Sequence, residues 1–328
     1  MFAAVKGARA SFVPVLLICL LLPPASPLQE AIAPTPIRVE TVLVNVPAVV
    51  NDRQGKPVRD LRKEDFTLLE DGVPQQISIF AGSEEAVNIA LLLDTSKSTV
   101  PVLGKIRNAA RSFVRRMRPA DRALVLSFDH DIRLVNPLTD DRVDLDRNIK
   151  AVRPGSYVGT RLRDAVMEVT AKRFQNLPGR KAIVLLSDGQ DYGSQTSIAD
   201  LLSSVAVSGT LVYSICYTVD LSALSRELFG VALPRRVAGG PWTQRQKEAE
   251  VFLRELSDLS AGRYMPSEVS DLGKVFGQIV EELRSQYILG YYPATARLDG
   301  SVHALAVHVR RPGAAVRART SYRVMKAR

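Results

Sequence analysis

Oxygen-bearing side chains gather at three places along the chain. The apolar run Leu91–Leu93 leads into Asp94–Ser98, which offers one carboxylate and two hydroxyls at alternate positions. A later loop carries Thr160, and Ser187–Gly189 directly follows the apolar run Ile183–Leu186. Together these loops offer Asp94, Ser96, Ser98, Thr160 and Asp188. An all-oxygen set with two carboxylates suits a hard cation such as Mg²⁺, so the sequence predicts a metal site.

The segments between and around these loops alternate between buried-strand and helical patterns. Parallel strands are expected at Val87–Leu93, Ala123–Phe128, Ala182–Leu186 and Thr210–Cys216, with an antiparallel edge strand at Ile132–Val135. Helices are expected at Val102–Met117, Leu162–Phe174, Ile198–Val207, Gln244–Leu259 and Leu272–Arg284. This alternation predicts an α/β fold with a doubly wound, mostly parallel, Rossmann-like sheet. Ligand sites of such sheets form at the carboxyl ends of the strands, so the three loops should meet there.

Short β runs flank this α/β region on both sides. They predict an N-terminal β module at 35–84, the α/β domain at 86–285 and a C-terminal β segment at 286–328. Because isolated hairpins are marginally stable, the last segment should pack with the first to form one small module. Tyr287, Tyr291 and Tyr292 are then expected to be buried there rather than exposed to a partner. The least regular stretch, Leu221–Trp242, is interpreted as a surface excursion with a short helix at Ser222–Phe229.

The first residues have the pattern of a secretory signal. Lys6 and Arg9 precede the apolar stretch Phe12–Leu22, and a proline pair follows it. The stretch is shorter than the roughly 20 apolar residues of a membrane-spanning helix, so residues 1–28 are interpreted as a cleaved signal and no stable membrane span is expected afterwards. The predicted location is secreted, periplasmic or cell envelope. Cleavage leaves Cys216 as the only cysteine, which excludes an internal disulfide and predicts a buried thiol.

The order and spacing of Asp94–Ser98, Gly159-Thr160 and Ser187–Gly189 resemble the metal-ion-dependent adhesion site of von Willebrand factor A domains. The resemblance extends over about Val87–Arg284. It implies Mg²⁺ or Mn²⁺ held by Asp94, Ser96, Ser98, Thr160 and Asp188, directly or through water. It also implies that an Asp or Glu carboxylate of a protein partner completes the metal shell. The chain is therefore interpreted as an adhesion-type protein-binding module and not an enzyme.

The flanking segments resemble those of bacterial proteins called von Willebrand factor A-related. In these proteins a segment like Leu61–Phe66 precedes the domain, and one like Tyr287–Pro293 follows it. The resemblance implies a bacterial cell-envelope or secreted location.

Other functions stay open from the residues alone. A scaffold of an envelope assembly that needs no metal is one alternative, and a hydrolase using Ser96, His130 and an aspartate is another. A phosphatase of the haloacid dehalogenase type is disfavoured because Ser96 stands where its second carboxylate belongs. The formal net charge is +10, but the basic residues are scattered without aromatic interleaving, so nucleic-acid binding is not predicted. Asp129 and Asp191 are interpreted as turn residues rather than ligands.

Overall fold

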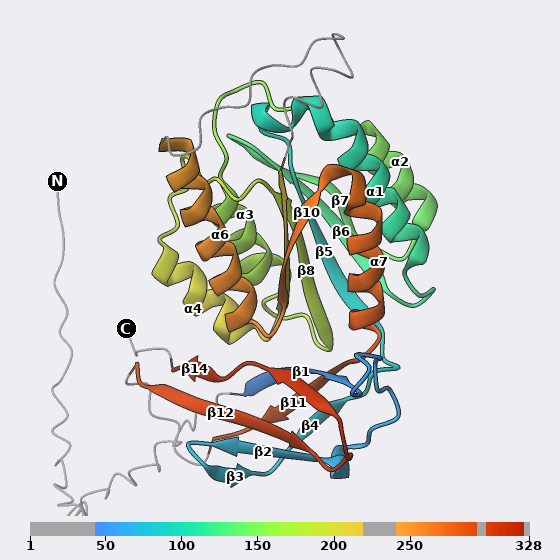
Figure 1. Cartoon of the computed structure of the whole chain (residues 1–328), viewed down its shortest axis with the longest axis vertical. Helices are drawn as coiled ribbons and strands as arrows, with labels where there is room; N and C mark the ends of the chain where they lie inside the picture. Colours follow the sequence, from blue (N-terminus) through green and yellow to red (C-terminus); the bar gives the residue numbers. More distant parts are fainter. Residues whose placement is uncertain (1–42, 219–240, 294–299, 325–328) are drawn as a thin grey trace, which may run out of the picture. The chain divides into compact units, whose positions relative to one another are not determined.

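The computed structural model describes residues 43–218, 241–293 and 300–324, all within one compact unit, Glu40–Arg328 (Figure 1). The predicted signal at 1–28 lies outside the described residues. So does the surface excursion predicted at Leu221–Trp242, with its short helix at Ser222–Phe229, except for residues 241 and 242, whose backbone is helical. Among the described helices, none combines the length and apolar character needed to cross a membrane.

A six-stranded sheet forms the centre of the larger domain, in the order β10-β9-β8-β5-β6-β7. Its strands are β5 (Val87–Asp94), β6 (Arg122–Phe128), β7 (Ile132–Thr139), β8 (Arg180–Ser187), β9 (Leu211–Thr218) and β10 (Arg263–Glu268). All neighbouring pairs are parallel except β6 with β7. The predicted mostly parallel sheet and its antiparallel edge strand are confirmed. Every residue of β8 is buried, because helices cover both faces of the sheet.

Two groups of helices cover this sheet (Figure 1). One face packs α1 (Leu103–Arg116), α2 (Arg142–Ala151) and α7 (Leu272–Leu283); the other packs α3 (Leu162–Glu168), α4 (Ile198–Ser208) and α6 (Pro241–Leu259). A 3₁₀ turn, Lys97–Val102, precedes α1, and a wider π turn, Val169–Arg173, continues α3. Further 3₁₀ turns are Lys63–Asp65 and Val269–Asp271.

Two elements of the α/β domain, α2 and β10, are not predicted from the sequence. Helix α2 buries only Leu145 and Ile149, so its apolar stripe is too narrow to stand out, although Asp141 caps its start by accepting from the amides of Val143 and Asp144. Strand β10 lies at the sheet edge and is half exposed, so it lacks a continuous apolar run.

Strands from both chain ends build two small antiparallel sheets, ordered β13-β1-β11-β4 and β14-β12-β2-β3. Their bounds are β1 Val44–Asn51, β2 Phe66–Glu70, β3 Val73–Gln75, β4 Ile79–Ala81, β11 Gln286–Tyr291, β12 Val302–Val309, β13 Ala315–Ala318 and β14 Ser321–Arg323. β1 pairs with β11, and β2 pairs with β12. The predicted module made from both ends is confirmed. Tyr287 and Tyr291 are buried in its core, but Tyr292 is 47% exposed, contrary to expectation, because it follows the last paired residue of β11.

Two arginines of the α/β domain, one of them fully buried, hold the connections to the β module. The fully buried Arg180 donates to the backbone carbonyls of Ser83, Glu85 and Leu283, and Arg118 also donates to Ser83. These carbonyls belong to the two connections by which the chain enters and leaves the domain. Burial, followed by the charge of Arg118, lowers the pKa of Arg180 to about 10.

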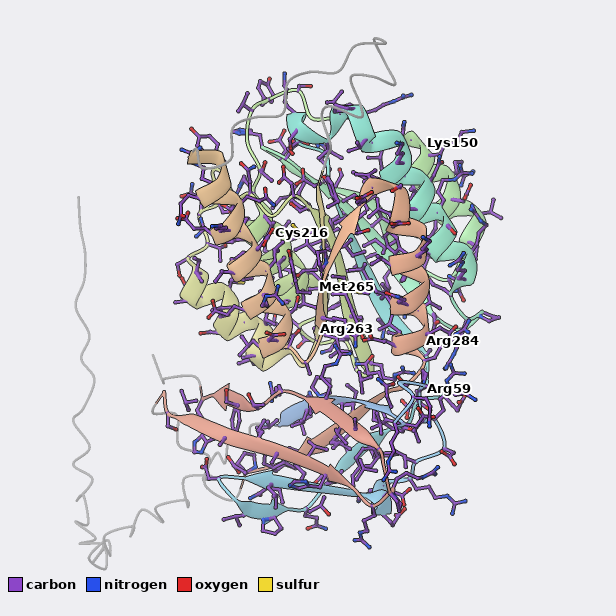
Figure 2. The ribbon with its side chains drawn as sticks, in the orientation of Figure 1. Arg59, Lys150, Cys216, Arg263, Met265 and Arg284 are labelled. Atoms are coloured by element: carbon purple, nitrogen blue, oxygen red, sulfur yellow. The ribbon has the colours of Figure 1, made fainter. Side chains whose placement is uncertain are left out.

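Arg59, Arg263 and Arg284, labelled in Figure 2, add ion pairs at the same junction. Arg59 and Arg284 both pair with Glu281, and Arg263 pairs with Glu282. Arginines from several elements therefore stabilise the junction between the β module and the α/β domain.

Candidate metal centre

The first loop is anchored by Asp94, the last residue of β5. Its side chain is fully buried, and its Oδ1 accepts from the amide of Ser96 at 2.9 Å. Its Oδ2 accepts from the Ser187 hydroxyl at 2.6 Å, which ties the end of β5 to the end of β8. The parallel pairing of β5 with β8 brings these two strand ends together. The first and third loops therefore meet as the sequence predicts.

A chain of short contacts continues from Asp94 to the third loop. The hydroxyls of Ser96 and Ser98 lie 3.1 Å apart, and Ser98 Oγ donates to Asp188 Oδ2 at 2.9 Å. Thr160 reaches the same place by backbone pairing: its amide and carbonyl bond to Tyr192 at 2.9 and 2.8 Å. Thr160 lines one cleft with Ser96, Ser98 and Asp188. The structure thus brings the five predicted residues to one edge of the sheet.

The two carboxylates of this cluster have no basic partner within the part of the chain that the structure describes. Burial raises the pKa of Asp94 to about 7, and the negative charge of Asp188 adds to the effect. Among the described residues, no Lys, Arg or His forms an ion pair with Asp94 or Asp188. Buried carboxylates normally pair with a cation, so the donor set fits a divalent metal ion by both its chemistry and its charge.

The cluster opens into a cleft of about 610 Å³ between the third loop and α6. Apolar side chains form part of its wall, among them Val158, Tyr192, Ile198 and Phe252. Tyr192 is 71% exposed and Val158 is 73% exposed. An exposed aromatic and aliphatic rim beside a polar centre is typical of a binding surface.

Asp129 has a role that the sequence analysis missed. It was interpreted as a turn residue, but its carboxylate is fully buried and binds both terminal nitrogens of Arg133, at 2.6 and 2.9 Å. It also accepts from Thr95 Oγ1 at 2.7 Å, which fixes the first loop. A Cβ on Gly155 would come within 2.4 Å of this carboxylate, so the second loop also packs on it. The four-residue spacing of Asp129 and Arg133 is the only sequence signal for the pair.

Asp164 and Asp191 fasten the continuation of the third loop to α3. Asp164 accepts from the amides of Gln195 and Thr196, the latter at 2.8 Å, and from Arg161. Burial alone would raise the pKa of Asp164, but these hydrogen bonds outweigh it and lower the pKa to about 2. Asp191 accepts from the Arg163 amide at 2.8 Å, so its carboxylate positions the loop.

Two side chains from the alternative hypotheses have other surroundings. His130 contacts the ring of Tyr157 at a centroid distance of 5.7 Å, and no hydrogen bond joins it to Ser96 among the described residues. Cys216 is a buried free thiol, and its burial raises its pKa to about 11.

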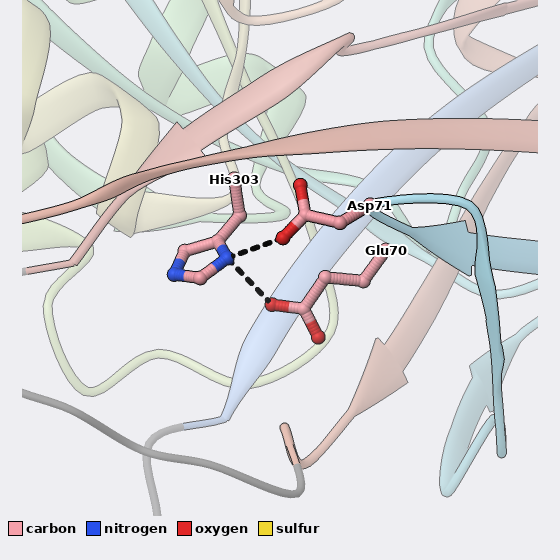
Figure 3. Close-up of side chains that lie close together, drawn as sticks. All are labelled: Glu70, Asp71 and His303. Carbon is pink, nitrogen blue, oxygen red and sulfur yellow. Dashed lines mark hydrogen bonds and ion pairs between the residues drawn. The ribbon is translucent and has the colours of Figure 1, made fainter.

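A second acidic cluster lies in the β module (Figure 3). His303 Nδ1 lies 2.7 Å from Asp71 Oδ2 and 3.5 Å from Glu70 Oε1. Its Nε2 lies 2.8 Å from the Ser301 hydroxyl. Asp71 also accepts from the amide of Ala304, and Glu70 accepts from Tyr322. These residues are spaced for a metal ion, but protein groups already occupy both ring nitrogens of the histidine.

Residues 89–190 match the family model of the von Willebrand factor type A domain. This range contains all five predicted ligand residues. No curated protein sequence matches the chain.

Several solved structures resemble part of this chain in fold. BatB, a conserved hypothetical protein from Bacteroides thetaiotaomicron, is 19% identical over 60% of this chain and 97% of its own, with a TM-score of 0.47. The von Willebrand factor domain of the type V pili tip protein Mfa5 from Porphyromonas gingivalis is 13% identical over 60% of this chain and 94% of its own, with a TM-score of 0.43.

Proximal thread matrix protein 1 from the mussel byssus, solved with a zinc-occupied MIDAS motif, is 16% identical, with a TM-score of 0.49. That likeness covers 66% of this chain and 50% of the mussel protein. At such identities and TM-scores these likenesses assign no function. The family match and the doubly wound sheet identify the α/β domain of this chain as a von Willebrand factor type A domain.

Proposed function

We propose that this protein binds Mg²⁺ or Mn²⁺ through Asp94, Ser96, Ser98, Thr160 and Asp188, and that the bound cation holds a partner protein. The observation that carries the proposal is the hydrogen-bonded cluster of oxygens around two carboxylates that no basic side chain of the described residues pairs with. Hard divalent cations take about six or more oxygen ligands, and no nitrogen or sulfur donor competes in this set.

The proposed partner contributes an Asp or Glu carboxylate. Ser96, Ser98, Thr160 and Asp188 line an open cleft, so a cation there is reachable from solvent on one side. A carboxylate oxygen is the protein ligand that best completes the shell of a hard cation. The exposed Tyr192 and Val158 beside the cleft offer apolar area to the same partner. This arrangement supports binding rather than catalysis, since His130 contacts Tyr157 instead of Ser96.

We also propose that the protein acts outside the cytoplasm, at the bacterial cell envelope or as a secreted protein. This proposal rests on the signal-like pattern of residues 1–28.

The first test is the thermal midpoint of the purified protein in EDTA, Mg²⁺ and Mn²⁺. A cation that binds only the folded protein stabilises it by about 2.7 kcal/mol at one hundred times its Kd. The wild type should therefore unfold at a higher temperature as the cation concentration rises, and Asp94→Ala/Asp188→Ala should not respond. The matched control is Glu255→Ala/Asp258→Ala, which removes two exposed carboxylates from α6 and should respond like the wild type.

The opposite result favours a different function. If neither cation raises the midpoint at about 10 mM, where even a weak site would be filled, the domain is a scaffold that needs no metal.

A second measurement tests the partner's chemistry. A short peptide that contains one aspartate should bind the Mn²⁺-loaded protein more tightly than its asparagine counterpart. EDTA should abolish that difference. Equal binding of the two peptides in Mn²⁺ would refute the carboxylate contact while leaving the metal site intact.

A further inference from the structure

The helices α1 and α2 carry an unusual concentration of positive charge. α1 contains no acidic residue, and its basic residues are Lys105, Arg107, Arg111, Arg115 and Arg116. By contrast, α6 on the other face mixes both signs along its length. A groove of about 530 Å³ runs between α1 and α2. Its charged lining consists of Arg107, Arg111, Arg147, Lys150 and Arg153.

The carboxylates beside this groove neutralise only part of its charge. Asp146 binds two nitrogens of Arg111, each at 2.8 Å, and also pairs with Arg115. Asp144 pairs with Arg147.

The remaining cations of the groove are Arg107, Lys150 and Arg153. Among the described residues, no carboxylate forms an ion pair with any of these three. Lys150 and Arg153 are exposed, and like charges held together repel one another. The groove therefore presents surplus positive charge that a bound anion would neutralise.

Arg107 is fixed in place before any ligand arrives. Its Nη1 donates to the carbonyl of Val152 at 3.1 Å and to that of Lys150 at 3.3 Å. These bonds use one nitrogen, and in the described parts of the chain no hydrogen bond occupies Nη2 or Nε, so both can bind a ligand. Gly104 lines the groove together with Arg107. A Cβ at Gly104 would meet nothing within 4 Å, so the groove is open beside this residue. A guanidinium held by the backbone loses little conformational entropy when it binds.

We propose that this groove binds a phosphate-bearing anion. Guanidinium groups bind phosphate oxygens through paired, charge-assisted hydrogen bonds, and the lysine adds a compact positive charge. The shared chemistry is a set of phosphate oxygens that carry at least two negative charges in total, on one group or on several singly charged groups close together. Its source is either a free oligophosphate or the headgroups of an anionic lipid surface. None of the residues that line this groove lines the cleft of the metal cluster, so this proposal does not depend on the metal.

The test measures binding of inorganic tripolyphosphate by titration calorimetry, and binding of phosphatidylglycerol-containing vesicles by co-sedimentation. Both measurements are made in EDTA, so that chelation at the metal cluster plays no part. The variant Lys150→Gln/Arg153→Gln removes two exposed cations without breaking an ion pair of the described residues. Its matched control, Lys247→Gln/Arg310→Gln, makes the same change in net charge at exposed positions on α6 and just after β12.

The wild type and the control should bind, and the groove variant should bind at least about tenfold more weakly, since each charged hydrogen bond is worth about that factor. Salt should weaken the binding because it screens exposed charges. Binding of tripolyphosphate alone identifies a soluble ligand, and binding of vesicles alone identifies a lipid surface. Failure to bind either probe, or an equal loss in the control, overturns the proposal.

Discussion

Two clusters in this molecule each bring two carboxylates close together, but they differ in the groups that contact those carboxylates. In the β module, Glu70 and Asp71 lie against His303, whose second nitrogen contacts Ser301. At the sheet edge, Asp94 and Asp188 approach each other with hydroxyls between them and no basic partner among the described residues. The comparison teaches that spacing alone does not indicate a cation site. An unneutralised charge is the better indicator.

The largest expected effect comes from Asp129, which lies beside the metal cluster but has its own cation in Arg133. Asp129→Ala should lower the free energy of unfolding by about 3 kcal/mol, because the Arg133 guanidinium loses both of its short bonds and the Thr95 hydroxyl and the Asp131 amide each lose an acceptor. Urea unfolding measures the change. Arg133→Ala should also destabilise the protein, because it leaves the buried Asp129 carboxylate without its cation. An effect below about 0.5 kcal/mol, that of an ordinary surface substitution, would show that charge pairing is not what holds these loops.

The next effect is the pH dependence that Asp164 confers. Its pKa in the folded protein is about 2, below the usual aspartate value of 3.8, so its stabilising contribution is present above pH 4 and is lost as the pH falls towards 2. The pKa difference corresponds to about 2 kcal/mol. The wild type should lose that much more stability than Asp164→Asn between pH 4 and pH 2, as measured by urea unfolding. Parallel pH profiles for the two proteins would contradict the assigned pKa.

A smaller effect of opposite sign is expected at Asp94. In EDTA, Asp94→Asn should raise the free energy of unfolding by about 1 kcal/mol, because it removes a buried charge that Asp188 repels. The same variant should lose the stabilisation by Mg²⁺ or Mn²⁺. Thermal unfolding with and without the cation measures both changes. If Asp94→Asn is instead less stable than the wild type in EDTA, the negative charge of the two carboxylates is already balanced without a metal ion.

The smallest effect is expected in the β module. His303→Gln should cost about 1 kcal/mol or less, since the histidine is partly exposed and its bonds lie near the surface. Its response to Mg²⁺ should equal that of the wild type. If a divalent cation stabilises the wild type but not His303→Gln, the β-module cluster is the metal site and the comparison is reversed.

The sequence allowed the central architecture and the meeting of the three loops to be predicted. Continuous apolar runs such as Val87–Leu93 signal buried parallel strands, and the carboxyl ends of such strands meet at one edge. Helix α2 and strand β10 were missed because each buries too few side chains to produce a clear pattern. The metal-binding role of the five loop residues stays a prediction until a cation titration is made.

The residues that hold the loops could not be predicted in the same way. Asp129 contacts Thr95, and Asp164 contacts Thr196, each more than thirty positions away along the chain. Hydrophobic periodicity carries no information about such polar contacts. Asp129 and Asp191 therefore looked like turn residues, although both carboxylates join separate segments.

Strand β5 connects the metal cluster to the β module, so it would carry any force applied to a bound cation. Asp94 is its last residue, and its first residue, Val87, follows the connection that Arg180 holds at Ser83 and Glu85. A partner that pulls on a cation at Asp94 would therefore stretch β5 along its length, against its anchor at the β module. The strand is flanked on both sides by parallel neighbours, β6 and β8. Tension would load the two rows of hydrogen bonds together, in shear, rather than opening them one after another.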